Sequence, residues 1–216
     1  MMRRILPLCL LTALILAGCV PAPITYFRPA AAGAQYEQSS CGGHAGPADT
    51  AVMRGPNGIL LSVRATSRPG RSLTGSGTGF ALALRIPGNL DSPVRLHSGV
   101  FRLTDEIAGR NYEYRAEHLL DFPEIRVPLD GLFVGLHTRT AVHRIDIHES
   151  LPAISSREKF NDNTTRPYYI LLEFPEADSD SLLLQIPPLQ IDSAAYQFPP
   201  VRFQRVTETI VVPLNC

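Results

Sequence analysis

The stretch Phe80-Ala81-Leu82-Ala83-Leu84-Arg85-Ile86 indicates the fold class, because its large apolar residues alternate strictly with small or polar ones. Side chains two positions apart lie on the same face of a β-strand, so this period of two predicts a strand with one buried face. Residues 59–66 have the same period. The glycine-rich segment 75–79 lies between these two stretches and is followed by a strand rather than a helix. It is therefore predicted to be a hairpin connection and not a nucleotide-binding loop.

Short apolar runs continue along the rest of the chain, punctuated by 19 prolines and 16 glycines. Their positions are 94–96, 100–103, 168–174, 182–186, 201–203 and 210–212. The apolar phase slips near Ser98 and Gly99, which predicts a bulge or a second strand there. No long stretch has an apolar stripe at helical spacing, and only residues 113–120 could form a short helix. We expect an all-β domain, an immunoglobulin-like β-sandwich first and a jelly roll or small β-barrel as the alternative.

The first eighteen residues have the order of a secretory signal peptide. Arg3 and Arg4 make the start positive, and an apolar run over residues 5–17 follows them. This run is too short to span a bilayer as a stable helix but suits the central region of an export signal. We therefore expect residues 1–18 to be removed on export.

The apolar run ends in Leu16-Ala17-Gly18-Cys19, an aliphatic residue and two small residues before a cysteine. This sequence resembles the lipobox of bacterial lipoproteins. The resemblance implies cleavage between Gly18 and Cys19 and acylation of Cys19, with palmitate among the chains, and several chains together give a stable anchor. Val20 resembles the outer-membrane sorting pattern, so the expected location is the outer membrane, facing the periplasm. The alternative is an ordinary signal peptide with a chance cysteine at its end.

Residues 19–40 are predicted to be the lipidated cysteine and a flexible tether, because prolines and alanines dominate them. One of the aromatic residues Tyr26, Phe27 and Tyr36 could dock on the domain, which is expected to span residues 41–216.

Two cysteines are left for the folded domain, since Cys9 departs with the leader and Cys19 would carry lipid. Export exposes them to oxidising conditions, so a disulfide between Cys41 and Cys216 is expected. Two free thiols or a metal pair are the alternatives. The full chain has 20 basic and 20 acidic residues. Removal of the leader takes away Arg3 and Arg4, which leaves 18 basic and 20 acidic residues in the mature chain. With charges so nearly balanced, the protein has no large positive electrostatic potential that would attract nucleic acid.

Three histidines invite a metal hypothesis that their spacing does not support. On a strand, His137 and His143 share a face and His148 points the other way, and on a helix positions 143 and 148 lie about 140° apart. No metal, cofactor or catalytic residue is therefore predicted. Asp178 and Asp180 could bind calcium with further oxygens, but a solvated turn is the preferred interpretation.

The segment from Ser156 to Lys159 matches the Ser-x-x-Lys of penicillin-binding proteins and serine β-lactamases. That family also needs a Lys-Thr-Gly strand, which is impossible here because Lys159 is the only lysine. We therefore reject this resemblance.

Three functions remain as hypotheses. The first is a non-enzymatic accessory or assembly factor that docks on another envelope protein, because edge strands can recruit partners by strand addition. The second is a module that binds glycan, peptidoglycan or a small ligand, against which the absence of tryptophan argues. The third is an unrecognised enzyme that uses Asp146 and His148. The irregular region 121–167 is expected to supply the loops where binding occurs.

Overall fold

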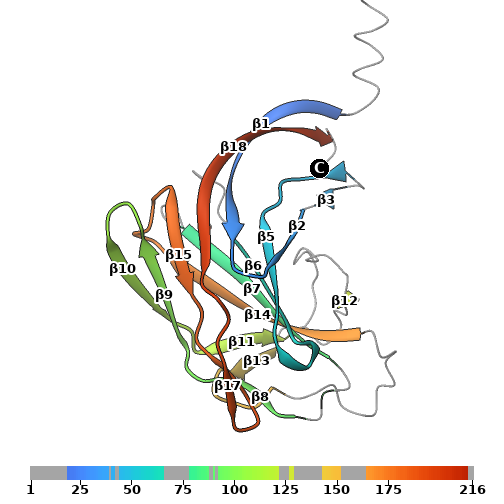
Figure 1. Ribbon diagram of the computed structural model, residues 1–216, viewed down its shortest axis with the longest axis vertical. Helices are drawn as coiled ribbons and strands as arrows, with labels where there is room; N and C mark the ends of the chain where they lie inside the picture. The colour runs from blue at the N-terminus through green and yellow to red at the C-terminus, as the bar shows by residue number, and fades with distance from the viewer. Residues whose placement is uncertain are drawn as a thin grey trace, which may run out of the picture.

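The structure is a computed structural model of the chain, drawn in Figure 1. It describes residues 19–38, 40–41, 44–65, 78–87, 90, 92–121, 127–128, 143–151 and 164–213. Within these ranges the regular elements are β-strands and a single 3₁₀ turn, η2 (Pro56–Gly58). The all-β prediction is therefore confirmed.

Two antiparallel sheets form most of the molecule. Sheet A has five strands, in the order β1 (Cys19–Ala30), β18 (Val201–Pro213), β15 (Ser181–Gln185), β9 (Val100–Asp105) and β10 (Arg110–Arg115). Sheet B has eight strands, in the order β13 (His143–Asp146), β11 (His118–Asp121), β14 (Thr164–Phe174), β7 (Thr78–Pro87), β6 (Leu60–Ala65), β5 (Thr50–Arg54) and β2 (Gln35–Glu37), with β12 (Val127–Pro128) also paired to β14.

Two smaller sheets complete the described part. They are β17 (Ala194–Tyr196), β16 (Leu189–Ile191) and β8 (Val94–Leu96), and the pair β3 (Ser40–Cys41) and β4 (His44–Ala45). Neither of the two large sheets closes on itself within the described ranges.

The core lies where the inner faces of sheets A and B meet. Phe80 of β7 in sheet B contacts Phe203 of β18 in sheet A, with ring centroids 4.8 Å apart. Both side chains are fully buried. Phe80 also makes an edge contact with Phe174 of β14 at 6.0 Å. Residues from both sheets thus belong to one hydrophobic cluster.

Strand β7 is buried on both faces, which the alternating pattern did not predict. The apolar residues point into the core as expected, but Ala81, Ala83 and Arg85 on the opposite face are also buried. β7 lies near the middle of the eight-stranded sheet, between β14 and β6, so both of its edges are paired. Arg85 is only 1 % exposed.

The phase slip at Ser98 and Gly99 marks a change of sheet, so the prediction of a second strand is correct. β8 and β9 lie on either side of it and belong to different sheets. Gly99 is required there because a Cβ would lie 2.3 Å from the carbonyl oxygen of Ala116. The Ala116 N–H donates to the Gly99 oxygen at 2.9 Å. The suggested short helix over 113–120 is wrong, since these residues form the end of β10 and most of β11.

Candidate functional site

The cysteine predicted to be acylated lies at the end of a long two-stranded ribbon. β1 pairs with β18 along its whole length, from Ala30 opposite Arg202 to Cys19 opposite Pro213. The neighbouring strand β15 begins at Ser181, opposite Gln204 of β18. From Gln204 toward Pro213, the described ribbon therefore consists of β1 and β18. Figure 1 shows it arching over the end of the molecule where β3 lies. Where the sequence predicts a flexible tether, the structure therefore has an ordered strand of the main sheet.

The ribbon also accounts for the aromatic residues of the predicted tether. Phe27 is 3 % exposed and belongs to the main core, and Tyr26 is buried beside it. Tyr36, at 47 % exposed, lies in β2. Docking by one of these side chains was predicted, and Phe27 confirms it.

The prolines of β1 all face the outer edge of the ribbon. The Arg205 N–H donates to the Asp180 carbonyl oxygen at 2.8 Å, on the side of β18 away from β1. Backbone groups alternate in direction along a strand, so the even-numbered residues of β18 bond to β1. Their partners in β1 are also even-numbered. The odd-numbered positions, which include Pro21, Pro23 and Pro29, therefore point outward, as is usual for proline in an edge strand.

Polar side chains tie the two strands of the ribbon together. The hydroxyl oxygens of Thr25 and Thr207 lie 2.8 Å apart, and the Tyr26 hydroxyl donates to Glu208 at 2.6 Å. Arg28 forms an ion pair with the same Glu208 carboxylate. Burial and the bond to Glu208 raise the pKa of Tyr26. The hydrogen bonds from Tyr26 and Arg28 lower the pKa of Glu208, so this cluster holds its charges at neutral pH.

Arg205 connects the ribbon to the body of the protein. Its guanidinium lies 2.6 Å from Asp178 and 3.1 Å from Asp180, and it covers the ring of Phe27 at 5.3 Å. The two aspartates, considered for calcium, are thus ion-pair partners of an arginine. A metal cluster is not found among the described residues.

The opposite edge of sheet A, at β10, has no proline. The Ala116 N–H donates to the Gly99 oxygen, and this pair continues the register between β10 and β9 by one residue. Because backbone groups alternate in direction along a strand, the even-numbered residues of β10 bond to β9. Asn111, Glu113 and Arg115 then present their backbone N–H and C=O groups outward. β10 is the last strand of this sheet in the described part of the chain.

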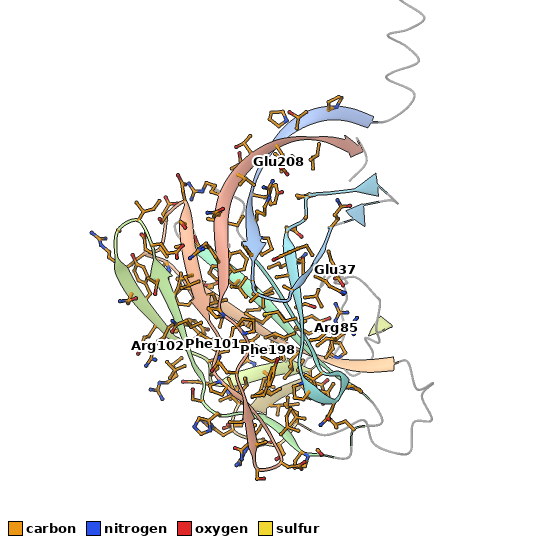
Figure 2. The ribbon with its side chains drawn as sticks, in the orientation of Figure 1. Glu37, Arg85, Phe101, Arg102, Phe198 and Glu208 are labelled. Carbon is orange, nitrogen blue, oxygen red and sulfur yellow. The ribbon has the colours of Figure 1, made fainter. Side chains whose placement is uncertain are left out.

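A pocket of about 330 Å³ lies at one end of sheet A. Arg102 and Gln185 line it from β9 and β15, and Gln197 and Phe198 line it from the segment between β17 and β18. Figure 2 labels Arg102 and Phe198. The Gln197 amide donates to the carbonyl oxygens of Ile186 and Phe198, which fixes the rim. The pocket offers polar groups and three prolines, Pro187, Pro188 and Pro200, while the Phe198 side chain is itself buried in the core.

A charged pair lies on the outer face of sheet B, where Figure 2 labels Glu37 and Arg85. The Arg85 Nη2 is 3.9 Å from the Glu37 Oε2, and the Arg85 side chain is 2 % exposed. Burial raises the pKa of Glu37, and Arg85 opposes that change. Arg85 Nη1 and Ser62 Oγ are buried without a hydrogen-bond partner in the described part of the chain. The face thus contains a buried charge with few partners among the described residues.

Asp146 and His148, the residues of the enzyme hypothesis, lie at the end of β13 and just after it. The Asp146 carboxylate accepts the backbone N–H of His148 at 2.8 Å, and the imidazole is exposed. A second pocket, of about 240 Å³, is lined by both residues and by His118. His143 is exposed at the start of β13, whereas His137 lies outside the described residues.

Several predicted features fall outside the residues that the structure describes. They are the leader with Gly18, the segment 75–77 of the glycine-rich connection, Ser156 and Lys159, most of region 121–167, and Cys216.

The predicted disulfide can still be related to the described strands. β18 ends at Pro213, three residues before Cys216, and it contacts β4. β4 pairs with β3, which contains Cys41. We expect a non-reducing digest to yield one peptide that links Cys41 to Cys216, and reduction to separate its halves. Loss of the bond by Cys41→Ser should cost roughly 2–5 kcal/mol of unfolding free energy. Thiols that react with iodoacetamide in the unreduced protein would contradict the pairing.

Comparison with known proteins gives no relative: no protein-family model, no curated protein and no solved structure matches the chain. Within the described ranges, no helix has the length and apolar character needed to cross a membrane.

Sequence reasoning missed two features of the site. It treated Arg205 as one more arginine, although this residue joins the ribbon to the body, and no local pattern distinguishes it. It also read the prolines of β1 as signs of a tether. Their common odd numbering was the signal that could have indicated an edge strand.

Proposed function

We propose that the protein is an envelope lipoprotein that is anchored through acylated Cys19, in the outer membrane, and docks without catalysis on another envelope protein. The observation that carries this proposal is the difference between the two edges of sheet A. The exposed residues Pro21 and Pro23 block the outer edge of β1, and Pro29 on the same edge is buried, whereas the edge at β10 presents the backbone groups of Asn111, Glu113 and Arg115. An exposed edge of this kind can accept a strand from a partner.

The finer form of the fold belongs to the same proposal. An immunoglobulin-like β-sandwich is supported by two antiparallel sheets that share one core and by a chain that passes repeatedly between them. Folds of this kind present edge strands on a rigid scaffold, which suits an accessory protein. A jelly roll is the alternative.

The test of docking is a substitution that alters only the outward edge of β10. Glu113→Pro removes an N–H that points away from β9, so the ladder within sheet A is kept. Glu113→Gln keeps this N–H and is the matched control, because both variants lose the exposed ion pair between Glu113 and Arg102. We expect in-cell crosslinking of the tagged protein to recover one abundant envelope protein with wild type and with Glu113→Gln, and to lose it with Glu113→Pro.

Two results would contradict docking at β10. Equal recovery of the partner by both variants would place the contact elsewhere. Recovery of bulk outer-membrane proteins and glycan alone, by every variant, would argue against an accessory role.

The second candidate function is binding of a glycan or small ligand, and the pocket beside Phe198 is the observation in its favour. Its lining includes Arg102, Gln185 and Gln197, whose polar groups can orient a sugar or another polar ligand. This candidate ranks below docking because about 330 Å³ is at the lower end of ligand pockets.

A further inference from the structure

The register of the ribbon ties a second segment of chain to the proposed anchor. Cys19 lies opposite Pro213, and Pro23 lies opposite Thr209. Paired strands are about 5 Å apart. If Cys19 is held at the lipid surface by its acyl chains, the backbone of residues 209–213 is therefore held there as well. We call residues 19–23 and 209–213 together the distal end of the ribbon.

The distal end contains no charged residue. Its sequences are Cys-Val-Pro-Ala-Pro and Thr-Ile-Val-Val-Pro. The first charged side chain along the ribbon is Glu208, opposite Ile24, and Arg28 follows. Ile24 is five positions along the strand from Cys19, a distance of about 17 Å. This length exceeds the headgroup layer on one side of a bilayer, which is roughly 5–8 Å thick.

Where their burial is described, the side chains of the distal end are accessible to solvent. Pro21, Pro23 and Thr209 are exposed, and Ala22 and Ile210 are only partly buried. An uncharged, mainly apolar strand pair at this position favours the boundary between headgroups and acyl chains over water. The cluster of Tyr26, Arg28 and Glu208 then lies on the aqueous side.

We propose that the distal end of the ribbon is seated in the lipid surface and that the ribbon is a stalk that holds the sheets away from the membrane. This inference rests on the proposed acylation of Cys19 and adds a second membrane contact to it. It replaces a flexible tether, which would allow any orientation, by a structure that fixes which end of the body faces the lipid.

Tryptophan fluorescence can test this contact without background, because the chain has no tryptophan. Ile210→Trp and Thr209→Trp place the indole on opposite faces of the distal end. Ala195→Trp is the control, at an exposed position of β17 at the other end of the molecule (Figure 1). Each full-length, acylated variant is reconstituted into vesicles of phosphatidylethanolamine and phosphatidylglycerol, with and without a lipid brominated on its acyl chains near the glycerol.

We expect at least one of the two ribbon variants to emit at shorter wavelength in vesicles than the same variant does in buffer without lipid or detergent. The brominated lipid should quench this emission. Ala195→Trp should show neither change. Vesicle flotation separates the two proposals. Protein that floats but is not quenched at 209 or 210 overturns the seated ribbon and leaves the anchor intact. Equal quenching at 195 overturns the stalk, because the body would then lie on the lipid. Protein that carries no acyl chain and does not float overturns both.

Discussion

Replacing Cys19 by serine is expected to move the protein from the membrane fraction to the soluble periplasmic fraction. The thiol is the proposed site of acylation, and membrane affinity rises by about 0.8 kcal/mol for each buried methylene of an acyl chain. Loss of all chains removes this term, while the uncharged distal end of the ribbon is too small to retain the protein alone. The N-terminal peptide of the wild-type protein should begin at Cys19 and carry the mass of its lipid.

The design must prevent an uncut leader from acting as an anchor. The Cys19→Ser variant is therefore made with an unrelated secretory leader that has an ordinary cleavage site. Cys9→Ser in the natural leader is the matched control, since it removes a cysteine of the apolar run and should leave membrane retention unchanged. Tight membrane retention of the cleaved Cys19→Ser protein would eliminate the lipoprotein assignment.

The strands of the core were predictable because their signal is local. The alternation over residues 80–86 predicts β7, and the apolar runs near 168–174 and 182–186 predict β14 and β15. Burial of the second face was not predictable in this way. Arg85 looks like a solvent-facing residue in its own strand. Its burial is set by tertiary surroundings, including Glu37 of β2, which the pattern of the strand does not contain.

The ribbon shows a second limit of local reasoning. The runs near 201–203 and 210–212 belong to one strand, β18, which pairs with β1 along its length. Because β1 lies about 180 residues away in sequence, no local pattern indicates this pairing. Neither half looks long enough alone, and the prolines of β1 favour a tether when its partner is unknown. Pairing with β18 converts the same prolines into edge residues.

The candidate sites divide along the same line. Cys19 could be identified because a leader and its cleavage site are contiguous in sequence. The pocket beside Phe198 could not, since its walls come from β9, from β15 and from the segments that follow β15 and β17. The β10 edge also required the structure, because its residues 113–115 had been assigned to a possible helix.

Replacing Phe80 by alanine is expected to lower the free energy of unfolding by about 3–5 kcal/mol, because a large buried ring is removed and a cavity is left. Phe80 is fully buried and contacts Phe203 across the two sheets, so the change weakens the joint between sheets A and B. Urea unfolding of the soluble Cys19→Ser protein measures the effect as a lower midpoint at unchanged slope.

Two further variants show whether this loss comes from the contact between the sheets. Ile107→Ala removes an apolar side chain that is 69 % exposed and should change stability by less than about 0.5 kcal/mol. Phe203→Ala combined with Phe80→Ala should cost less than the sum of the two single changes, since aromatic pairs couple by about 0.5–1.5 kcal/mol beyond their buried area. Strict additivity, or a Phe80→Ala loss as small as that of Ile107→Ala, would mean that sheets A and B do not share a core at this position.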